Sequence, residues 1–188
     1  MKTFVEIGAC DFNNLDGLLD AGWRGVLVEP IPEYYESLVS KVNMSPNAMA
    51  AQVVNAAITD HDGVVDMDTV PGGPGWMRGI SHISSEVLEN TVSGLVKKNA
   101  PDAMRKISVK AMRLDTLLKA SEIDHIDLLQ MDVEGHELVI LNDYSWRIKP
   151  SFIRIEHKFV DDTILFALLE SKGYKCWTEQ DDIYGILL

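Results

Sequence analysis

The segment Ile126-Asp127-Leu128-Leu129-Gln130-Met131 decides the fold class, because it is a short and nearly continuous apolar run. Such runs are typical of strands that are buried on both faces, as in parallel sheets. The run continues into Asp132-Val133-Glu134-Gly135-His136-Glu137, where we expect a helix to begin. A buried strand that leads directly into a helix predicts one unit of an open α/β sheet.

The same alternation of strands and helices extends outward in both directions. Upstream we expect strands at 4–7, 25–28, 53–58 and 107–112, with helices from residue 15, over 32–42 and from Asp115. Downstream we expect a strand at 152–155, a helix over 161–171, and a final antiparallel pair at 174–178 and 183–188. This order predicts a Rossmann-like, doubly wound and mostly parallel α/β sheet.

The stretch at about 59–106 interrupts this alternation. It contains the loop signal Pro71-Gly72-Gly73-Pro74-Gly75-Trp76, and we expect a helix after it that is capped by Ser84 or Ser85. The length of 188 residues suits one domain. We therefore predict a single domain over 1–188 with a lid-like insert at about 59–106.

The composition excludes several classes of protein. The chain carries 17 basic and 29 acidic residues, and its net charge of −12 argues against a general nucleic-acid binder. No stretch approaches the roughly 18 unbroken apolar residues of a membrane span. The two cysteines make no disulfide framework, and the N-terminal residues do not resemble a signal peptide. We expect a cytoplasmic protein. The sequence does not decide whether it forms a homo-oligomer.

Acidic side chains gather where the predicted strands end. Ligands of an open α/β sheet bind at the carboxyl ends of its strands. A site lined by acids would repel a phosphate-rich ligand, whereas it would suit a ligand with a positive centre and free hydroxyls. The residues at these ends are Glu6, Gly8, Glu29, Asp60, Asp132, Glu134, Glu156 and His157.

The turn after the first predicted strand, Gly8-Ala9-Cys10-Asp11-Phe12-Asn13, keeps only part of a dinucleotide-binding pattern. In G-x-G-x-x-G the glycines bring the backbone close to a pyrophosphate, but Cys10 and Asn13 replace the second and third of them. Glu29 follows Gly8 by 21 residues, the distance at which an acid binds ribose hydroxyls. The pattern favours a nucleoside-containing ligand without a pyrophosphate.

Six segments, in order along the chain, resemble the motifs of FkbM-type methyltransferases. The resemblance implies a class I S-adenosylmethionine-dependent O-methyltransferase, with a seven-stranded sheet whose last strand is antiparallel. It also implies that the methylated hydroxyl belongs to a sugar, a glycan or a natural product. The segments are Val5-Glu6-Ile7-Gly8-Ala9, Gly25-Val26-Leu27-Val28-Glu29-Pro30, Asn55-Ala56-Ala57-Ile58, Arg113-Leu114-Asp115-Thr116-Leu117-Leu118, Asp132-Val133-Glu134-Gly135-His136-Glu137 and Ile155-Glu156-His157.

The resemblance further implies how S-adenosylmethionine would lie. Gly8 and Ala9 would lie beside its methionine part, and Glu29 would bind the ribose hydroxyls. Ile31 would pack on adenine, and Asp132 would lie near the amino group or the sulfonium. The predicted cofactor site is completed by Glu6, Asp11, Pro30, the adenine-edge residues Ala57 and Ile58, and Glu134.

Methyl transfer to a hydroxyl requires a group that takes the proton. His157 is the first candidate for this base, because it ends a predicted strand and histidine is a common general base; His136 is the second and His82 the third. Asp132 is expected to accommodate the sulfonium during catalysis. As an alternative, Asp132, Glu134, Glu156 and His157 could hold Mg²⁺, which would acidify the hydroxyl.

Two other functions stay open. One is a nicotinamide-dependent oxidoreductase on a doubly wound sheet, against which the two missing glycines count. The other is a non-catalytic nucleoside-binding module, against which the intact acids at the strand ends count. Binding of S-adenosylhomocysteine without binding of NAD would separate the methyltransferase from both.

Overall fold

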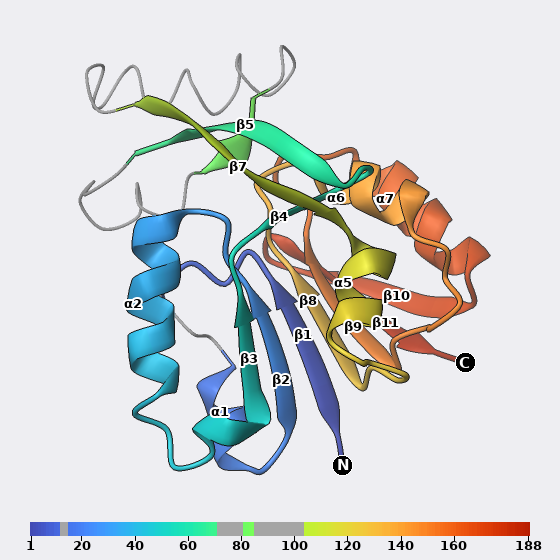
Figure 1. Ribbon diagram of the computed structural model, residues 1–188. Helices are drawn as coiled ribbons and strands as arrows, with labels where there is room; N and C mark the ends of the chain where they lie inside the picture. Colours follow the sequence, from blue (N-terminus) through green and yellow to red (C-terminus); the bar gives the residue numbers. More distant parts are fainter. Residues whose placement is uncertain (12–14, 71–80, 85–103) are drawn as a thin grey trace.

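The strand predicted around Leu128 lies inside a sheet of seven strands (Figure 1). A computed structural model of the chain describes residues 1–11, 15–70, 81–84 and 104–188. The strands of this main sheet are β1 (Thr3–Ile7), β2 (Arg24–Val28), β3 (Ala51–Val54), β8 (Leu128–Met131), β9 (Phe152–Glu156), β10 (Tyr174–Glu179) and β11 (Asp182–Leu187). Their order across the sheet is β10-β11-β9-β8-β1-β2-β3.

The main sheet has the predicted directions. Parallel pairs join β3, β2, β1, β8 and β9, whereas β11 runs antiparallel to both β9 and β10. The prediction of a mostly parallel, seven-stranded sheet with an antiparallel last strand is therefore confirmed. The chain winds outward from β1 to β3 on one side and from β8 to β9 on the other, so the point between β1 and β8 is where ligands of such sheets bind.

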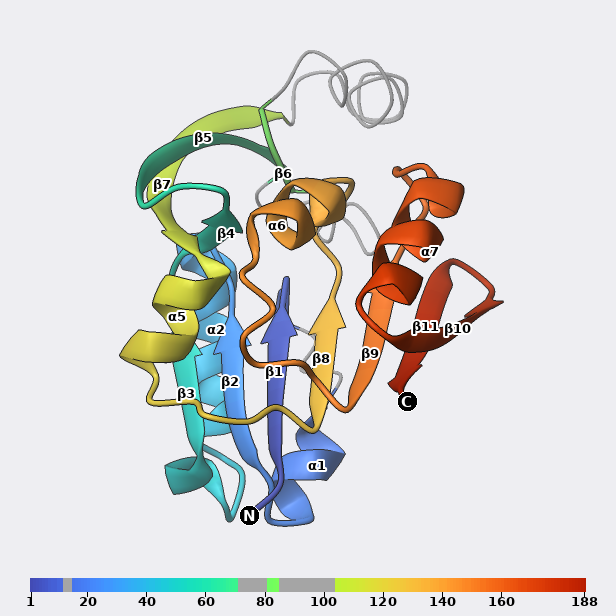
Figure 2. The same ribbon diagram turned by 90° about the vertical axis from the view of Figure 1, so that its right-hand side faces the viewer.

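Helices cover the main sheet on both faces (Figures 1 and 2). On one face Leu129 packs in a buried cluster with Leu141 and Leu165; on the other face Phe4 packs with Leu38. None of the described helices is long and apolar enough to cross a membrane. The helices are α1 (Asp16–Asp20), α2 (Pro32–Val42), α5 (Leu114–Ala120), α6 (Glu137–Asp143) and α7 (Asp162–Ser171), with a short 3-10 helix, η1 (Ala48–Ala50).

A second sheet lies at the carboxyl-end side of the main sheet (Figure 2). Its strands are β4 (Ala57–Thr59), β5 (Gly63–Thr69), β6 (His82–Ile83) and β7 (Arg105–Arg113), in the order β4-β7-β5-β6. The described parts of the predicted insert are thus strands, and the lid-like role of the insert stays a prediction. The helix expected after Ser84 and the loop around Trp76 lie outside the described residues.

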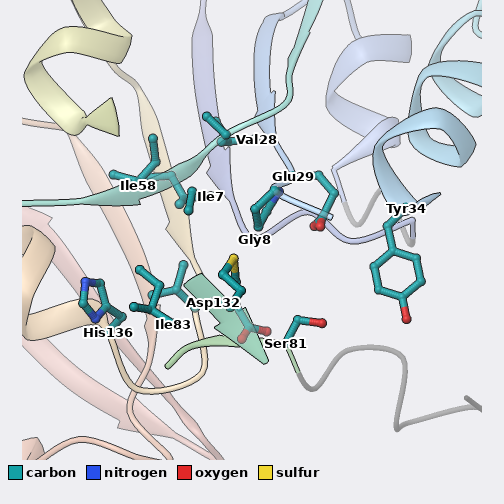
Figure 3. Close-up of a pocket in the computed structure, with 15 residues that line it drawn as sticks. Ile7, Gly8, Val28, Glu29, Tyr34, Ile58, Ser81, Ile83, Asp132 and His136 are labelled. Carbon is teal, nitrogen blue, oxygen red and sulfur yellow. The ribbon is translucent and has the colours of Figure 1, made fainter. Parts of the chain in front are cut away.

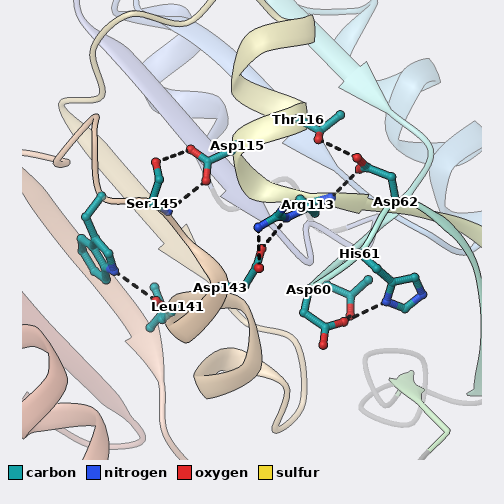
Figure 4. A network of polar contacts seen from close by, with 11 residues as sticks. Asp60, His61, Asp62, Arg113, Asp115, Thr116, Leu141, Asp143 and Ser145 are labelled. Atoms are coloured by element: carbon teal, nitrogen blue, oxygen red, sulfur yellow. Dashed lines mark hydrogen bonds and ion pairs between the residues drawn. The ribbon is translucent and has the colours of Figure 1, made fainter.

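Polar contacts fasten the second sheet to the helices of the main sheet (Figure 4). The guanidinium of Arg113, at the end of β7, donates to both carboxylate oxygens of Asp143 at 2.8 and 2.6 Å. Asp62 accepts from the Arg113 backbone N–H and from the Thr116 hydroxyl, both at 2.9 Å. Exposed pairs of this kind add little free energy each, but together they fix where β7 enters α5.

One predicted strand is divided between the two sheets. The apolar run at 53–58 was expected to be continuous, yet β3 ends at Val54 and β4 begins at Ala57 in the other sheet. Asn55 causes the break, because its side-chain amide donates to the carbonyls of Glu29 (2.9 Å) and Pro30 (3.0 Å). The prediction of one continuous strand at 53–58 was wrong, because the hydrogen bonds of Asn55 do not alter the pattern of apolar residues on which it was based.

The two helices that were predicted to start at an aspartate differ in outcome. The helix expected over 161–171 is α7, and Asp161 caps it by accepting a hydrogen bond from the Ile164 backbone N–H at 3.2 Å. Asp115 lies inside the first turn of α5, whose N-cap residue is Arg113. The Asp115 carboxylate instead accepts from the backbone and hydroxyl of Ser145, so it joins α5 to the loop after α6.

Candidate active site

A pocket lies between the carboxyl ends of β1, β2 and β8 and the second sheet (Figure 3). Its position is the switch point of the main sheet, where the sequence predicted a ligand. Main-sheet residues form one wall, and residues of β4, β5 and β6 form the opposite wall. The lining residues are Ile7, Gly8, Val28, Glu29, Pro30, Tyr34, Ala56, Ala57, Ile58, Met67, Ser81, Ile83, Asp132, Val133 and His136.

Gly8 is required by a close approach of two strands. Its φ is +83°, and a β-carbon at this position would lie 1.7 Å from the carbonyl oxygen of Asp132. The backbone N–H groups of Gly8 and Ala9 both donate to the Val28 carbonyl at 3.0 Å. The turn after β1 is therefore held against the ends of β2 and β8 at once, and only glycine fits there.

Glu29 is buried at the end of β2, with 3% of its surface exposed. One carboxylate oxygen accepts from the Cys10 N–H at 2.8 Å, and the other accepts from the Ile31 N–H at 2.7 Å. Burial raises the pKa of Glu29 to about 7, although these two hydrogen bonds act in the opposite direction. The carboxylate thus links the turns after β1 and β2 at the edge of the pocket.

Three acids meet beside the pocket. One carboxylate oxygen each of Asp132, Glu134 and Glu156 lie within 4.8 Å of one another. Burial, followed by the charge of Asp132, raises the pKa of Glu134 to about 8 and also raises the pKa of Glu156. Three like charges this close are unfavourable, so protons or a positively charged ligand must neutralise part of the cluster.

Glu137 supports the loop after β8, although no motif in the sequence singled it out. It is 1% exposed at the start of α6, and its Oε1 accepts from the N–H groups of Val133 (3.0 Å) and Gly135 (3.3 Å). Burial raises the pKa of Glu137 to about 7. Its contacts shape the loop that carries Asp132 and Glu134, and an acid in a first helical turn was the available signal.

His136 lines the pocket and begins a chain of polar contacts. Its Nε2 lies 3.0 Å from the Thr59 hydroxyl, and that hydroxyl donates to Asp60 at 3.2 Å. Because the hydroxyl has a single proton, its oxygen must accept from Nε2–H, which leaves Nδ1 as the acceptor nitrogen of the neutral ring. Burial lowers the pKa of His136 and so favours this neutral form.

The chain ends at the surface with Asp60 and His61, whose Oδ1 and Nδ1 lie 2.8 Å apart (Figure 4). This hydrogen bond lowers the pKa of Asp60 and raises the pKa of His61. Asp60 is consequently an ionised acceptor, as the orientation of the Thr59 hydroxyl requires. The contacts run from a pocket side chain, through Thr59, to solvent.

Several predicted site residues lie outside the pocket lining. The carboxylate of Asp11 accepts from the Ser37 hydroxyl at 3.2 Å and lies near Lys41 on α2. Glu6 accepts from the Gln130 side chain at 3.3 Å, on the neighbouring strand β8. The remaining predicted residues that are not in the lining are Ala9, Ile31, Glu134, Glu156, His82 and His157.

His157, the first candidate for the base, is not among the residues that line the pocket. Its backbone N–H donates to the Asp181 carbonyl at 2.9 Å, and its buried Nε2 has no hydrogen-bond partner among the described residues. It also does not belong to the group of carboxylates around Asp132, which brings together the other three residues that were expected to hold a metal, Asp132, Glu134 and Glu156. The roles predicted for His157 find no support in this geometry.

Contributions from α2, β5 and β6 could not be read from the sequence. Tyr34 is buried in the pocket wall, and its hydroxyl donates to the Val70 carbonyl at 3.1 Å. Met67 and Ile83 come from β5 and β6 of the second sheet, and Ser81 directly precedes β6. No sequence motif identifies Met67 and Ile83, because the pairing of β5 with β6 brings them to the pocket.

The strand order and the pocket at the switch point define the class I methyltransferase fold. The fold is similar to that of the methyltransferase FkbM from Methylobacillus flagellatus KT, with a TM-score of 0.57, 15% identity, and coverage of 98% of this chain and 43% of that chain. It is also similar to the methyltransferase domain of METTL16, with a TM-score of 0.52, 12% identity, and coverage of 98% and 58%.

The chain belongs to the methyltransferase FkbM domain family, whose model matches residues 6–176. The resemblance read from the six segments is thereby confirmed. A curated relative is the methyltransferase sdnD of Sordaria araneosa, which is 24% identical over 169 residues, or 78% of this chain and 62% of the relative. The chain spans less than two thirds of the length of sdnD and of the bacterial FkbM structure.

Proposed function

We propose that this protein is an S-adenosylmethionine-dependent O-methyltransferase that acts on a hydroxyl of a sugar, a glycan or a natural product. The observation that carries the proposal is the pairing of Gly8 and Glu29 in one pocket wall at the switch point. A wall that has a glycine turn and a buried acid, but no second or third glycine, suits a nucleoside without a pyrophosphate.

The pocket residues fit such a cofactor. Glu29 has a carboxylate at the pocket edge that would accept hydrogen bonds from ribose hydroxyls. Ala57 and Ile58 supply an apolar surface for adenine, with Pro30 beside Glu29. The methionine part would lie beside Gly8 and Asp132, which both line the pocket. When bound, S-adenosylmethionine supplies an electrophilic methyl group on a positively charged sulfur.

His136 is the base in this proposal, in place of His157. It lines the pocket, it is neutral at working pH because burial lowers its pKa, and Thr59 holds its Nε2–H. Nδ1 of the ring is then the nitrogen that takes the hydroxyl proton of the acceptor. Thr59 and Asp60 keep the ring in this tautomer, and Asp60 stabilises the imidazolium that forms.

The acids around Asp132 accommodate positive charge. Asp132 lines the pocket, and Glu134 and Glu156 lie beside it. We propose that bound protons and the positive sulfur neutralise this cluster; burial and the neighbouring carboxylates, which raise the pKa values of Glu134 and Glu156, support the proposal. Mg²⁺ is the alternative occupant of the cluster. Unchanged methyl transfer after treatment with EDTA would support neutralisation by protons. Loss of transfer that added Mg²⁺ restores would support the metal.

Calorimetry tests the cofactor, and isotope transfer tests the reaction. S-adenosylhomocysteine is expected to bind with micromolar affinity, and NAD is expected not to bind. Binding of NAD alone would favour a nicotinamide-dependent oxidoreductase, and binding of neither would favour a non-catalytic module. Transfer of tritiated methyl groups to a panel of glycan and natural-product acceptors identifies the substrate, and labelling of amines alone would contradict O-methylation.

A further inference from the structure

The strand β10 forms one edge of the main sheet (Figure 2). It pairs with β11 on one side, and no described strand borders its other side. Proteins protect such edges, because the unpaired backbone groups of an edge strand bind other strands. The outer side of β10 is therefore a place where another chain can add to the sheet.

The hydrogen-bond pattern identifies which backbone groups of β10 point outward. Leu188 N–H donates to the Gly173 carbonyl at 3.1 Å, so these two residues form a hydrogen-bonded pair of the antiparallel ladder. Such pairs alternate with pairs that lack these bonds, and the backbone groups of the latter point away from the partner strand. In β10 these are Tyr174, Cys176 and Thr178.

Aromatic side chains cover the sheet face beside this edge. Trp177 is 42% exposed and stacks on Tyr184, with ring centroids 5.6 Å apart and an angle of 14° between the planes. Phe152 lies 5.9 Å from Trp177. An exposed tryptophan on a rigid aromatic neighbour is typical of the centre of a protein interface.

The charges of β10 are arranged symmetrically about Trp177. Lys175 precedes it by two residues and Glu179 follows it by two, so all three side chains lie on the same face of the strand. Within the chain Glu179 lies opposite another acid, Asp182. An antiparallel copy of β10 centred on Trp177 would bring a lysine opposite each Glu179, which is favourable for a directly opposed pair.

We propose that β10 pairs antiparallel with β10 of a second copy of this chain, with Trp177 on the twofold axis. In this register Cys176 lies opposite Thr178 of the other copy, so outward-pointing backbone groups meet and form the ladder. Lys175 lies opposite Glu179 of the other copy, twice by symmetry. The result is one continuous sheet through both copies.

The charges of β10 favour the register centred on Trp177 over the register centred on Cys176. A pairing centred on Cys176 would also join outward-pointing backbone groups, but it would bring Lys175 opposite Trp177 and leave Glu179 beside Asp182. A lone lysine on an edge strand would act against pairing. Lys175 and Glu179 instead lie two residues on either side of Trp177, so each of them meets an opposite charge when β10 pairs with β10 of a second copy.

Sedimentation equilibrium of the whole chain over a range of concentrations tests the proposal. We expect a reversible dimer. Glu179→Lys and Lys175→Glu, each of which creates two like-charged pairs, should raise the dimer dissociation constant about tenfold or more. The double variant K175E/E179K exchanges the charges and should return the constant to within about threefold of the wild type.

Thr178→Pro provides an independent test, because it removes an outward N–H while keeping the bonds of β10 to β11. It should abolish the dimer, and circular dichroism and S-adenosylhomocysteine binding should show that the fold persists. Lys172→Glu, on the loop after α7, is the control and should leave the dimer intact. A monomeric wild type, or single charge variants that the double variant fails to rescue, would overturn the proposal.

Discussion

The two sheets of the molecule differ in how deeply their strands are buried. β1 is buried along its whole length, and β8 is buried except at its first residue. In β5 and β7, buried residues are concentrated toward one end, and the rest of each strand is exposed or half-buried. The main sheet therefore forms a rigid wall of the pocket, whereas the second sheet contributes individual side chains from a more open structure.

This difference indicates what each wall tolerates. The main-sheet wall is held together by a close backbone contact at Gly8 and by the buried carboxylate of Glu29. Neighbouring atoms cannot move to accommodate a change at either residue, because the interior is closely packed. The second-sheet wall meets the pocket through the side chains of Met67, Ser81 and Ile83. We infer that the main-sheet wall binds the cofactor together with β4, and that β5 and β6 of the second-sheet wall select the acceptor, so changes in the two groups should differ in kind.

The largest effect is expected at Gly8. Gly8→Ala would drive a β-carbon to 1.7 Å from the Asp132 carbonyl, so β1 and β8 would have to separate. We expect a loss of about 2–4 kcal/mol in the free energy of unfolding and loss of measurable S-adenosylhomocysteine binding. Denaturant titration and calorimetry measure the two quantities.

Gly22→Ala is the matched control for this change. Gly22 has nearly the same φ, +81°, but no neighbouring atom lies within 4 Å of the place that a β-carbon would take. The backbone strain alone should lower the free energy of unfolding by about 1–2 kcal/mol and leave cofactor binding intact. Equal behaviour of the two variants would show that the close approach to Asp132 is unimportant.

A large effect on catalysis alone is expected at His136. His136→Ala should lower kcat by about 100–10,000-fold while S-adenosylhomocysteine still binds, because the base is lost but Gly8 and Glu29 remain. Thr59→Val should lower kcat about tenfold, since it frees the ring to adopt the other tautomer. Steady-state kinetics and calorimetry measure these effects, with the exposed His125→Ala as control.

The pH dependence of His136 has a defined sign. The neutral ring is the active form, so the rate rises with pH through the pKa of His136 and then stays level. Burial lowers that pKa, so the level part should extend to lower pH than for an ordinary histidine. A rate profile that keeps its shape in His136→Ala would contradict the assignment.

An intermediate effect is expected at Glu29. Glu29→Gln should weaken S-adenosylhomocysteine binding about 10–100-fold, because hydrogen bonds to a charged acceptor are replaced by bonds to a neutral one. With a pKa of about 7, wild-type Glu29 ionises between pH 6 and 8, so affinity should rise across this range. Calorimetry at several pH values should find a smaller rise in the variant; Glu33→Gln, on the exposed side of α2, is the control.

The smallest effect is expected in the second-sheet wall. Ile83→Ala and Met67→Ala should each raise the KM of the acceptor about 5–10-fold, since each removes about 1–1.4 kcal/mol of apolar contact. The affinity for S-adenosylhomocysteine should change less than about threefold. Val64→Ala, at an exposed position of β5, is the control. An equal weakening of S-adenosylhomocysteine binding and of acceptor binding would mean that the two walls are not specialised.

The amino-acid sequence by itself determined the features that depend on local patterns. The apolar run at Leu128 predicted a strand buried on both faces, and the 21-residue spacing from Gly8 to Glu29 predicted two strand ends at one site. Both follow from chain geometry, because alternating strands and helices leave few topologies open.

Only the tertiary structure decided which side chains meet. Thr59 and His136 are 77 residues apart, and their contact depends on β4 leaving the main sheet, which Asn55 causes through its bonds to Glu29 and Pro30. His157 was the better candidate by position along its strand, but it lies outside the pocket lining. Periodicity determines which face of an element is buried, whereas a catalytic contact depends on the packing of elements distant in sequence.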